Sequence, residues 1–162
     1  MPDGRLWSAG DAGRDGADAG RAGGDDETEL VEFVVDSGAR VHVFARRGLC
    51  VVGGGEPGWV CGFGGQAFEA GHAAVAGVML GGAPMETLLG YYVPGARWNV
   101  LSERELARVG VQVYRAPNPE EPDSPSMCLR WSWWVPGAGR EVGMYMRDGL
   151  YWVTARVRVQ RS

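Results

Sequence analysis

Asp36 is the acidic residue whose neighbours are best suited to chemistry. It follows the apolar pair Val34-Val35 at the end of a strand predicted over Leu30–Val35, and it precedes Ser37-Gly38-Ala39. The apolar strand fixes the backbone, the serine hydroxyl can bond to a partner loop, and the glycine permits a tight turn and the close approach of another backbone. Two such loops that meet at a two-fold axis bring two carboxylates together.

A pair of adjacent carboxylates is suited to the hydrolysis of a peptide bond. Because like charges at close range cannot both ionise, the pair shares one proton at mildly acid pH. The ionised member takes a proton from a trapped water, and the protonated member donates one to the peptide carbonyl oxygen. Asp-Ser-Gly is also an ordinary turn tripeptide in which the aspartate caps the turn. By itself, therefore, the motif leaves both interpretations open.

A second segment, some 60 residues further along the chain, is predicted to support this loop. Asn99-Val100-Leu101-Ser102 leads into a short helix, which begins with a capping box formed by Ser102 and Glu105. Leu106 and Val109 continue its apolar side, and Gly110 stands where a left-handed C-terminal cap is expected. The pattern predicts no other helix in the chain.

The ordered motifs resemble the protease segment of copia-type retrotransposon Pol polyproteins, a branch of the retropepsin-like aspartic proteases. That family commonly has Asp-Ser-Gly-Ala followed, after two further residues, by His, which here corresponds to Asp36-Ser37-Gly38-Ala39 and His42. A Leu-Tyr-Val-Pro-Gly stretch then precedes an Asn-Leu-Leu-Ser stretch and a helix. The matching segment is Tyr91-Tyr92-Val93-Pro94-Gly95-Ala96-Arg97-Trp98-Asn99-Val100-Leu101-Ser102, and Gly149-Leu150-Tyr151 resembles a Gly-Leu-Tyr element that follows the protease. The resemblance covers roughly residues 30–155 in a consistent order.

The resemblance implies an all-β fold, a retropepsin-like closed β-barrel with one short α-helix. It implies a homodimeric aspartic endopeptidase with one catalytic aspartate, Asp36, in each chain and an extended polypeptide as its substrate. Ser37, Gly38 and Ala39 support the catalytic loop in this interpretation. The floor of the site is formed by Asn99, Val100, Leu101 and Ser102.

The resemblance also implies a flap hairpin that closes over the substrate, which we expect near Phe68–Val75. Strands over 67–71 and 74–80 flank a turn of small residues, so the flap residues are Phe68, Gly71, His72 and Ala73. The family often has Gly-x-Gly at this point, and Ala73 stands in place of the second glycine. Because alanine adopts a positive φ only at a cost, this difference calls flap mobility, and with it catalysis, into question.

The charge distribution separates an acidic leader from a nearly neutral remainder. Residues 1–29 hold eight acidic residues and three arginines, whereas residues 30–162 hold 12 acidic residues and 13 arginines. Residues 1–28 are rich in glycine and alanine and have few apolar anchors, so we expect them to be disordered. We expect a barrel domain over residues 29–115, an exposed proline-rich loop over 116–126, and a C-terminal β extension over 127–162 that packs on the barrel.

Composition argues against several classes of protein. The absence of a basic patch argues against a nucleic-acid partner, and no apolar run approaches the ~20 residues that span a bilayer. No signal peptide pattern is present, so we expect a cytoplasmic protein. Cys50, Cys61 and Cys128 do not form a disulfide framework, and His42 and His72 lack the spacing of metal ligands. We therefore expect no metal and no other cofactor.

Two other classes of function stay open beside the endopeptidase. One is a catalytically inactive, domesticated retrotransposon-derived β-barrel that acts as a binding or dimerisation module, which the altered flap favours. The other is a small metal-binding protein, supported only by scattered cysteines and histidines. The intact Asp36-Ser37-Gly38 favours the enzyme. His42 is interpreted as a structural histidine or a neighbour of the catalytic pair, and the tryptophans at 131, 133 and 134 as packed against the barrel or lining a groove.

Overall fold

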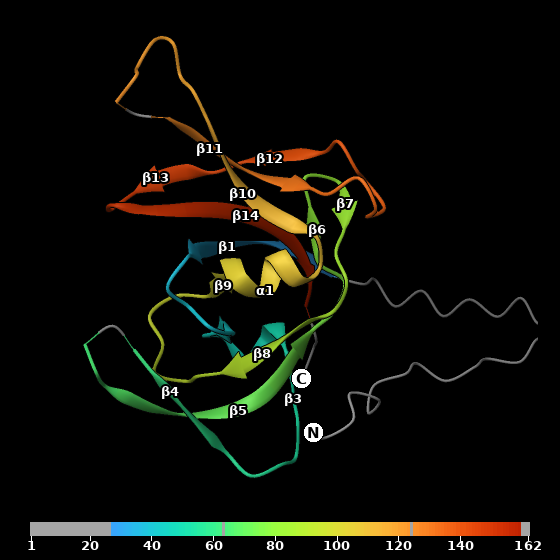
Figure 1. Cartoon of the computed structure of the whole chain (residues 1–162). Coiled ribbons are helices and arrows are strands. Elements are labelled where there is room, and N and C mark those ends of the chain that lie inside the picture. The colour runs from blue at the N-terminus through green and yellow to red at the C-terminus, as the bar shows by residue number, and fades with distance from the viewer. Residues whose placement is uncertain (1–26, 63, 124, 160–162) are drawn as a thin grey trace, which may run out of the picture.

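A computed structural model of the chain describes residues 27–62, 64–123 and 125–159 (Figure 1). This part is mostly β-strand with one short α-helix, so the all-β prediction is confirmed. The leader predicted over residues 1–28 lies outside the described residues up to residue 26, and Thr28 already begins the first strand.

Eleven of the fourteen strands form one sheet, and three form a second. The strands of the main sheet are β1 (Thr28–Asp36), β2 (His42–Phe44), β3 (Val51–Val52), β4 (Gly58–Cys61), β5 (Ala67–Val75), β6 (Met79–Leu80), β7 (Ala83–Pro84), β8 (Leu88–Tyr92), β9 (Val100–Ser102), β13 (Tyr145–Arg147) and β14 (Leu150–Arg158). The second sheet contains β10 (Val111–Ala116), β11 (Ser126–Trp131) and β12 (Glu141–Gly143). The helix α1 spans Glu103–Arg108, and a 3-10 turn, η1, spans Arg47–Leu49.

The main sheet is an open path rather than the closed barrel that we expected. Its strand order is β3-β5-β8-β2-β9-β1-β14-β6-β7, with β4 paired to β5 and β13 paired to β14. Within the described residues, no pairing joins β3 to β7. Both end strands have two residues, and glycines 53–55 follow β3 while Pro84 ends β7. Glycine and proline both interrupt strands, so neither end strand has the length to extend the ladder toward the other.

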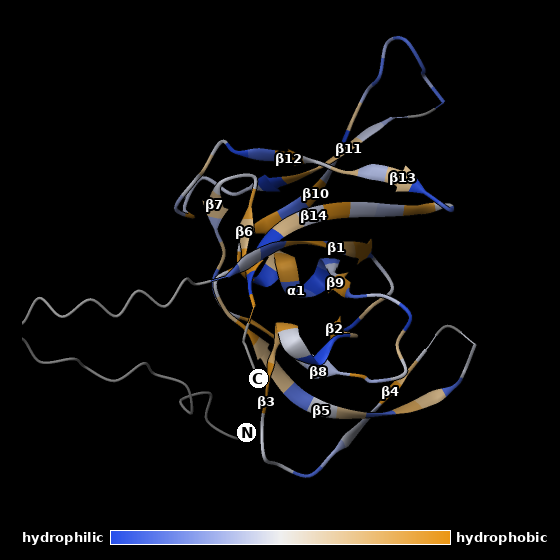
Figure 2. Ribbon diagram, turned by 180° about the vertical axis from the view of Figure 1, so that it is seen from behind, coloured by the Kyte–Doolittle hydropathy of each residue, from blue (hydrophilic) through white to orange (hydrophobic). Residues whose placement is uncertain are grey.

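The core lies beneath the long antiparallel pair of β1 and β14. The two strands pair from Thr28 with Arg158 to Val34 with Trp152. Val153, Ala155 and Val157 are buried while Arg156 and Arg158 are exposed, as the alternation in the sequence predicts. Figure 2 shows hydrophobic segments in β1, β6 and β14, whereas the connection between β10 and β11, which protrudes above them, is largely hydrophilic.

The C-terminal segment is part of both sheets, which differs from the extension packed on a finished barrel that we expected. In the main sheet, β9 pairs with one edge of β1 and β14 pairs with the other. β10 and β11 pair from Val111 with Trp131 to Ala116 with Ser126. The proline-rich segment is thus the connection of a hairpin, and it protrudes at the top of Figure 1.

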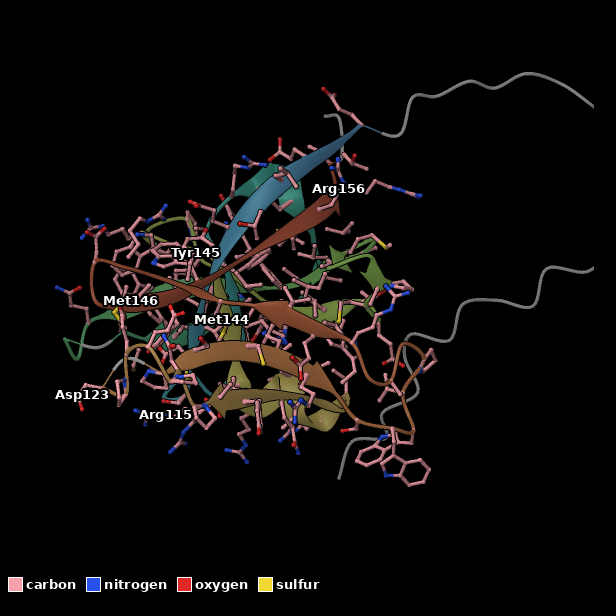
Figure 3. The ribbon with its side chains drawn as sticks, turned by 90° about the horizontal axis from the view of Figure 1, so that it is seen from above. Arg115, Asp123, Met144, Tyr145, Met146 and Arg156 are labelled. Carbon is pink, nitrogen blue, oxygen red and sulfur yellow. The ribbon has the colours of Figure 1, made fainter. Side chains whose placement is uncertain are left out.

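The segment that leads from β12 to β14 contains β13, which pairs with the start of β14. In Figure 3, seen from above, Met144, Tyr145 and Met146 lie along this segment and Arg156 lies near the opposite end of β14. The Tyr145 hydroxyl donates to Glu32 of β1 over 2.6 Å. Hydrogen bonds from Arg147 and then from Tyr145 lower the pKa of the Glu32 carboxyl. This exposed cluster ties β13 to β1 across β14.

The tryptophan cluster is divided between core and surface. Trp131 ends β11 and is buried, whereas Trp133 and Trp134 are 83% and 62% exposed. Packing of Trp131 was predicted correctly, but that of Trp133 and Trp134 was not. The reason is a series of turns after β11, in which the Val135 amide donates to the carbonyl of Ser132. Along the described part of the chain, no helix combines the length and the apolar character needed to cross a bilayer.

Candidate active site

The strand β9 is inserted between β1 and β2, the two strands that the Asp36 loop connects. β9 runs parallel to β1, with Val34 beside Val100 and Asp36 beside Ser102. It runs antiparallel to β2, where Val43 pairs with Val100. The floor residues predicted from the sequence are therefore brought directly against the strand that ends in Asp36, although some 60 residues separate them in the chain.

Asp36 itself forms a tight turn at the end of β1. Its Oδ1 accepts a hydrogen bond of 2.7 Å from the Gly38 amide. The Asp36 side chain is half-buried, Ser37 and Gly38 are exposed, and Ala39 is half-buried. The loop thus carries one carboxylate, orients one of its oxygens by a backbone amide, and presents its serine and glycine to the outside.

Ser102 connects this loop to the helix. Its side chain is fully buried, and its Oγ donates to the carbonyl of Ala39 over 2.7 Å while it accepts from the Glu105 amide over 3.2 Å. The second bond is the predicted N-cap of α1. The reciprocal bond of a capping box is not formed, because the Glu105 carboxylate pairs with Arg108 instead.

His42 takes the place of that missing capping partner. The Ser102 amide donates to His42 Nδ1 over 3.0 Å, and the imidazole is 3% exposed. Burial lowers the pKa of His42 to about 4. Since Nδ1 accepts a hydrogen bond, it carries no proton, and the neutral ring has its proton on Nε2. His42 is therefore a neutral, fully enclosed acceptor beneath the Asp36 loop.

Gly90 is required by the close approach of β8 to His42. β2 and β8 run parallel, and His42 is the register partner of Gly90. A Cβ built on Gly90 would lie 2.8 Å from the Cβ of His42 and would also meet its backbone. Any larger residue would push the two strands apart, so Gly90 fixes how closely the histidine is held.

The other floor residues join neighbouring strands. The Asn99 carbonyl accepts from the Val34 amide over 2.9 Å, and Asn99 Oδ1 accepts from the Ala45 amide over 2.9 Å. Asn99 thereby fastens β1 to the end of β2. Leu101 is buried in the core, and Val100 is half-buried in the ladder between β1 and β2.

The hairpin that we expected to turn at Gly71–Ala73 turns elsewhere. β5 runs without a break from Ala67 to Val75, and His72 pairs with Tyr91 of β8 in its interior. The small residues Gly71, Ala73 and Ala74 allow β5 to lie between β3 and β8 rather than to turn. Gly71 lies so close to Val52 that a Cβ would meet its side chain at 2.9 Å. Flap positions Gly71, His72 and Ala73 are thus strand positions, and the prediction of a turn there is wrong.

The hairpin formed by β4 and β5 turns between Gly62 and Gln66, where residues 62 and 64–66 are described. The Gly62 amide donates to the carbonyl of Gln66 over 2.8 Å, and Gly65 has a φ of 74°. In Figures 1 and 2 this turn and the Asp36 loop lie at the same end of the molecule. The glycines that give this hairpin its turn are therefore present, and the alanine at position 73 has no bearing on them.

Phe68 is the one predicted flap residue that lies next to the turn. Its ring lies against Gly95, where a Cβ would be 3.3 Å from Phe68 Cδ1, and against Gly62, where a Cβ would be 3.1 Å from Cε2. The aromatic ring thus connects the glycine-rich hairpin with the Pro94-Gly95 turn that precedes β9.

A hollow of about 500 Å³ lies near the start of β1 and β9, away from Asp36. Its aromatic walls are Trp98 and Trp152, whose rings meet edge to face with centroids 5.8 Å apart. Arg147 lies over Trp152 at 4.2 Å. Asp36 is not among its lining residues, so this hollow does not include the candidate catalytic carboxylate.

No protein-family model matches the sequence, and no curated protein is significantly similar to it. The geometry therefore carries the chemical interpretation. It provides one oriented carboxylate on a loop supported by a strand, a helix cap and a buried imidazole. Sequence reasoning missed Gly90 and the bond from Ser102 to His42. A glycine inside an apolar strand was the available signal for the first, while nothing in the spacing indicated the second.

Proposed function

We propose that this protein is a retropepsin-like aspartic endopeptidase that acts as a homodimer, with Asp36 of each chain as the catalytic carboxylate. The observation that carries the proposal is the insertion of β9 between β1 and β2, which sets Asp36 beside Ser102 at the end of parallel strands. An ordinary turn aspartate needs no such support from a distant strand. The glycine-rich turn at 62–66 and the order of the motifs along the chain also favour this function.

A dimer is part of the proposal because the described part of one chain supplies one such loop. Two copies related by a two-fold axis bring the Asp36 side chains together, and an isologous contact needs only one self-complementary surface. The substrate is an extended polypeptide, held by backbone pairing with the β4–β5 hairpin.

The chemistry follows from the pair of carboxylates. One member, ionised, takes a proton from a water molecule as that water attacks the peptide carbonyl. The other member donates its proton to the carbonyl oxygen, so a neutral tetrahedral intermediate forms. The first member then donates the proton it gained to the amide nitrogen while the second takes a proton from a hydroxyl of the intermediate, so the C–N bond breaks and an amine and a carboxylic acid are released. The proposal requires no cofactor. It places the enzyme in the cytoplasm, where the thiols of Cys50, Cys61 and Cys128, which form no disulfide, stay reduced.

A second candidate is an inactive dimerisation or binding module with the same strands. It is favoured by one observation, the bond from the Gly38 amide to Asp36 Oδ1, which also occurs in ordinary turns. Under this alternative Asp36 serves the turn alone. Asparagine can replace aspartate in such a turn without loss of the bond, which makes the two candidates separable.

The test is cleavage of an unfolded protein substrate at about pH 4–6, the range in which a carboxylate pair shares a proton. Wild type is compared with Asp36→Asn, which keeps the turn and removes the catalytic charge. Asp148→Asn, an exposed turn aspartate, is the matched control. We expect cleavage by wild type and by the control, blocked by a statine-type inhibitor, and at least a ~10³-fold loss in Asp36→Asn. Equal cleavage by wild type and Asp36→Asn, or none by a wild-type preparation shown to be dimeric, would overturn the proposal.

A further inference from the structure

Three strand ends meet below the candidate catalytic loop. Asp36 ends β1, His42 begins β2, and Ser102 ends β9. Ser102 is the register partner of Asp36, where the loop begins. Its hydroxyl donates to the carbonyl of Ala39 in the middle of the loop, and its amide donates to His42 at the far end. Any shift of Ser102 is therefore transmitted to the loop from both sides.

We propose that His42 is a positioning residue, whose neutral imidazole accepts the Ser102 amide hydrogen and thereby holds the end of β9 against the loop that carries Asp36. The inference rests on the proposed function, since it assigns His42 a part in catalysis at that same loop. His42 acts through Ser102 and need not touch the substrate.

The surroundings of His42 favour this role over simple filling of the core. The backbone and Cβ of His42 lie close to Gly90, whose lack of a side chain admits the close approach of β8, and the ring stacks on Phe44 with centroids 6.5 Å apart. Its Nδ1 is directed at a backbone amide that would otherwise lack its capping partner, because Glu105 pairs with Arg108. An apolar side chain of the same size would fill the space and leave that amide unsatisfied.

The role depends on the protonation state of the ring. Protonation places a hydrogen on Nδ1 opposite the Ser102 amide hydrogen, so the bond is lost and two donors face each other. Burial lowers the pKa of His42 to about 4, and no charged group, including Asp36, Glu103 and Glu105, is among the causes of the shift. The neutral state is therefore maintained by packing, and the bond from the Ser102 amide to Nδ1 favours it further.

Two substitutions at His42 separate an acceptor from a space-filling group. His42→Phe keeps an aromatic ring and removes the acceptor, whereas His42→Asn retains an oxygen acceptor near the position of Nδ1. His72→Phe and His72→Asn, at the exposed histidine of β5, are the matched controls. Each protein is measured for kcat and KM on a peptide substrate from pH 3 to 7, and for hydrogen exchange of the Ser102 amide by NMR.

In His42→Phe we expect kcat to fall about 100-fold with KM changed less than ~3-fold, because a small misplacement of catalytic groups reduces rate more than binding. The Ser102 amide should exchange at least ~10-fold faster, since its bond is lost. His42→Asn should recover most of kcat and of the protection. Its activity should also persist to lower pH than that of wild type, because it has no ring to protonate.

The outcomes distinguish this inference from the proposed function. If wild type shows no Asp36-dependent cleavage, the proposed function and any catalytic role for His42 both fail, and the exchange of the Ser102 amide then reports only whether the bond exists. If wild type cleaves and His42→Phe equals it in kcat and in Ser102 exchange, the inference about His42 alone is overturned. Should His42→Phe not fold, the comparison of wild type with His42→Asn still tests the inference. If kcat falls at the same pH in both proteins as the pH is lowered, the inference is overturned.

Discussion

Three hydrogen bonds of the candidate site meet at Ser102. The amide donates to His42, the hydroxyl donates to Ala39, and the same hydroxyl caps α1 by accepting from Glu105. A small hydroxyl side chain is needed here, because it acts as donor and acceptor within a fully buried space. The helix, the loop and β2 therefore share one residue, which links the position of Asp36 to the packing of the core.

At the residue scale, His42 should make folding stability depend on pH. Its pKa is about 4 in the folded chain and about 6.5 when unfolded. The unfolded state thus binds an extra proton between these values. The contribution of neutral His42 to the free energy of unfolding is therefore complete above about pH 6.5, is lost progressively as pH falls to about 4, and stays lost below that. The expected loss is about 3 kcal/mol, measured by urea unfolding at several pH values.

The comparison that isolates His42 is His42→Asn. Between pH 6.5 and pH 4, the slope of the free energy of unfolding against pH should be smaller in this variant than in wild type. The difference should correspond to about one bound proton, whatever the stability of the variant at pH 7. His72→Asn, at an exposed histidine, should retain the wild-type slope. Identical slopes in wild type and His42→Asn would contradict the assignment of a buried neutral imidazole.

At the scale of elements, the contact between β2 and β8 depends on Gly90. In Gly90→Ala the new Cβ meets His42, so the strands must separate or shift in register. We expect a loss of about 2–3 kcal/mol in the free energy of unfolding, together with reduced cleavage because His42 moves. Gly54→Ala is the control, as nothing lies within 4 Å of its Cβ position. Equal stability of the two variants would show that β8 does not approach His42 so closely.

The position of the hairpin turn makes a second prediction at this scale. If the turn were at Gly71–Ala73, Ala73→Gly would restore a flap glycine and raise activity. Because Ala73 is a buried strand residue, we expect instead a loss of about 1 kcal/mol in stability and no gain in cleavage. Gly65→Ala, at a φ of 74°, should stiffen the real turn and cost about 1 kcal/mol. Faster cleavage by Ala73→Gly would favour the flap position expected from the sequence.

Local signals account for what could be predicted from the sequence. Alternation of side chains predicted the faces of β14, and the cap at Ser102 with Gly110 predicted α1. The hairpin turn was misplaced because small residues occur both in turns and in strands that lie close to a neighbour, and only the neighbour decides between them. Whether the end strands of a sheet pair with each other, and whether His42 contacts Ser102, depends on residues far apart in sequence, which no local pattern records.

At the scale of the whole molecule, β1 occupies a central position. It pairs with β14 along most of its length and with β9 at the end that carries Asp36. The candidate catalytic loop is thus attached to a strand that is paired on both edges, while the glycine-rich turn between β4 and β5 lies at the same end of the molecule (Figure 1). A carboxylate on a well-paired strand, at the same end of the molecule as a glycine-rich hairpin, suits a site that binds an extended chain.

The proposed homodimer leads to a prediction that single-chain catalysis does not share. When wild type is unfolded, mixed with Asp36→Asn and refolded, chains assort at random, and only a dimer with two Asp36 side chains retains the acid and the base. Cleavage should therefore fall with the square of the wild-type fraction, to about one quarter in an equal mixture. Asp148→Asn replaces Asp36→Asn in the control mixture, where activity should not change. A linear fall, to about one half, would mean that each chain cleaves by itself and that the second carboxylate is not needed.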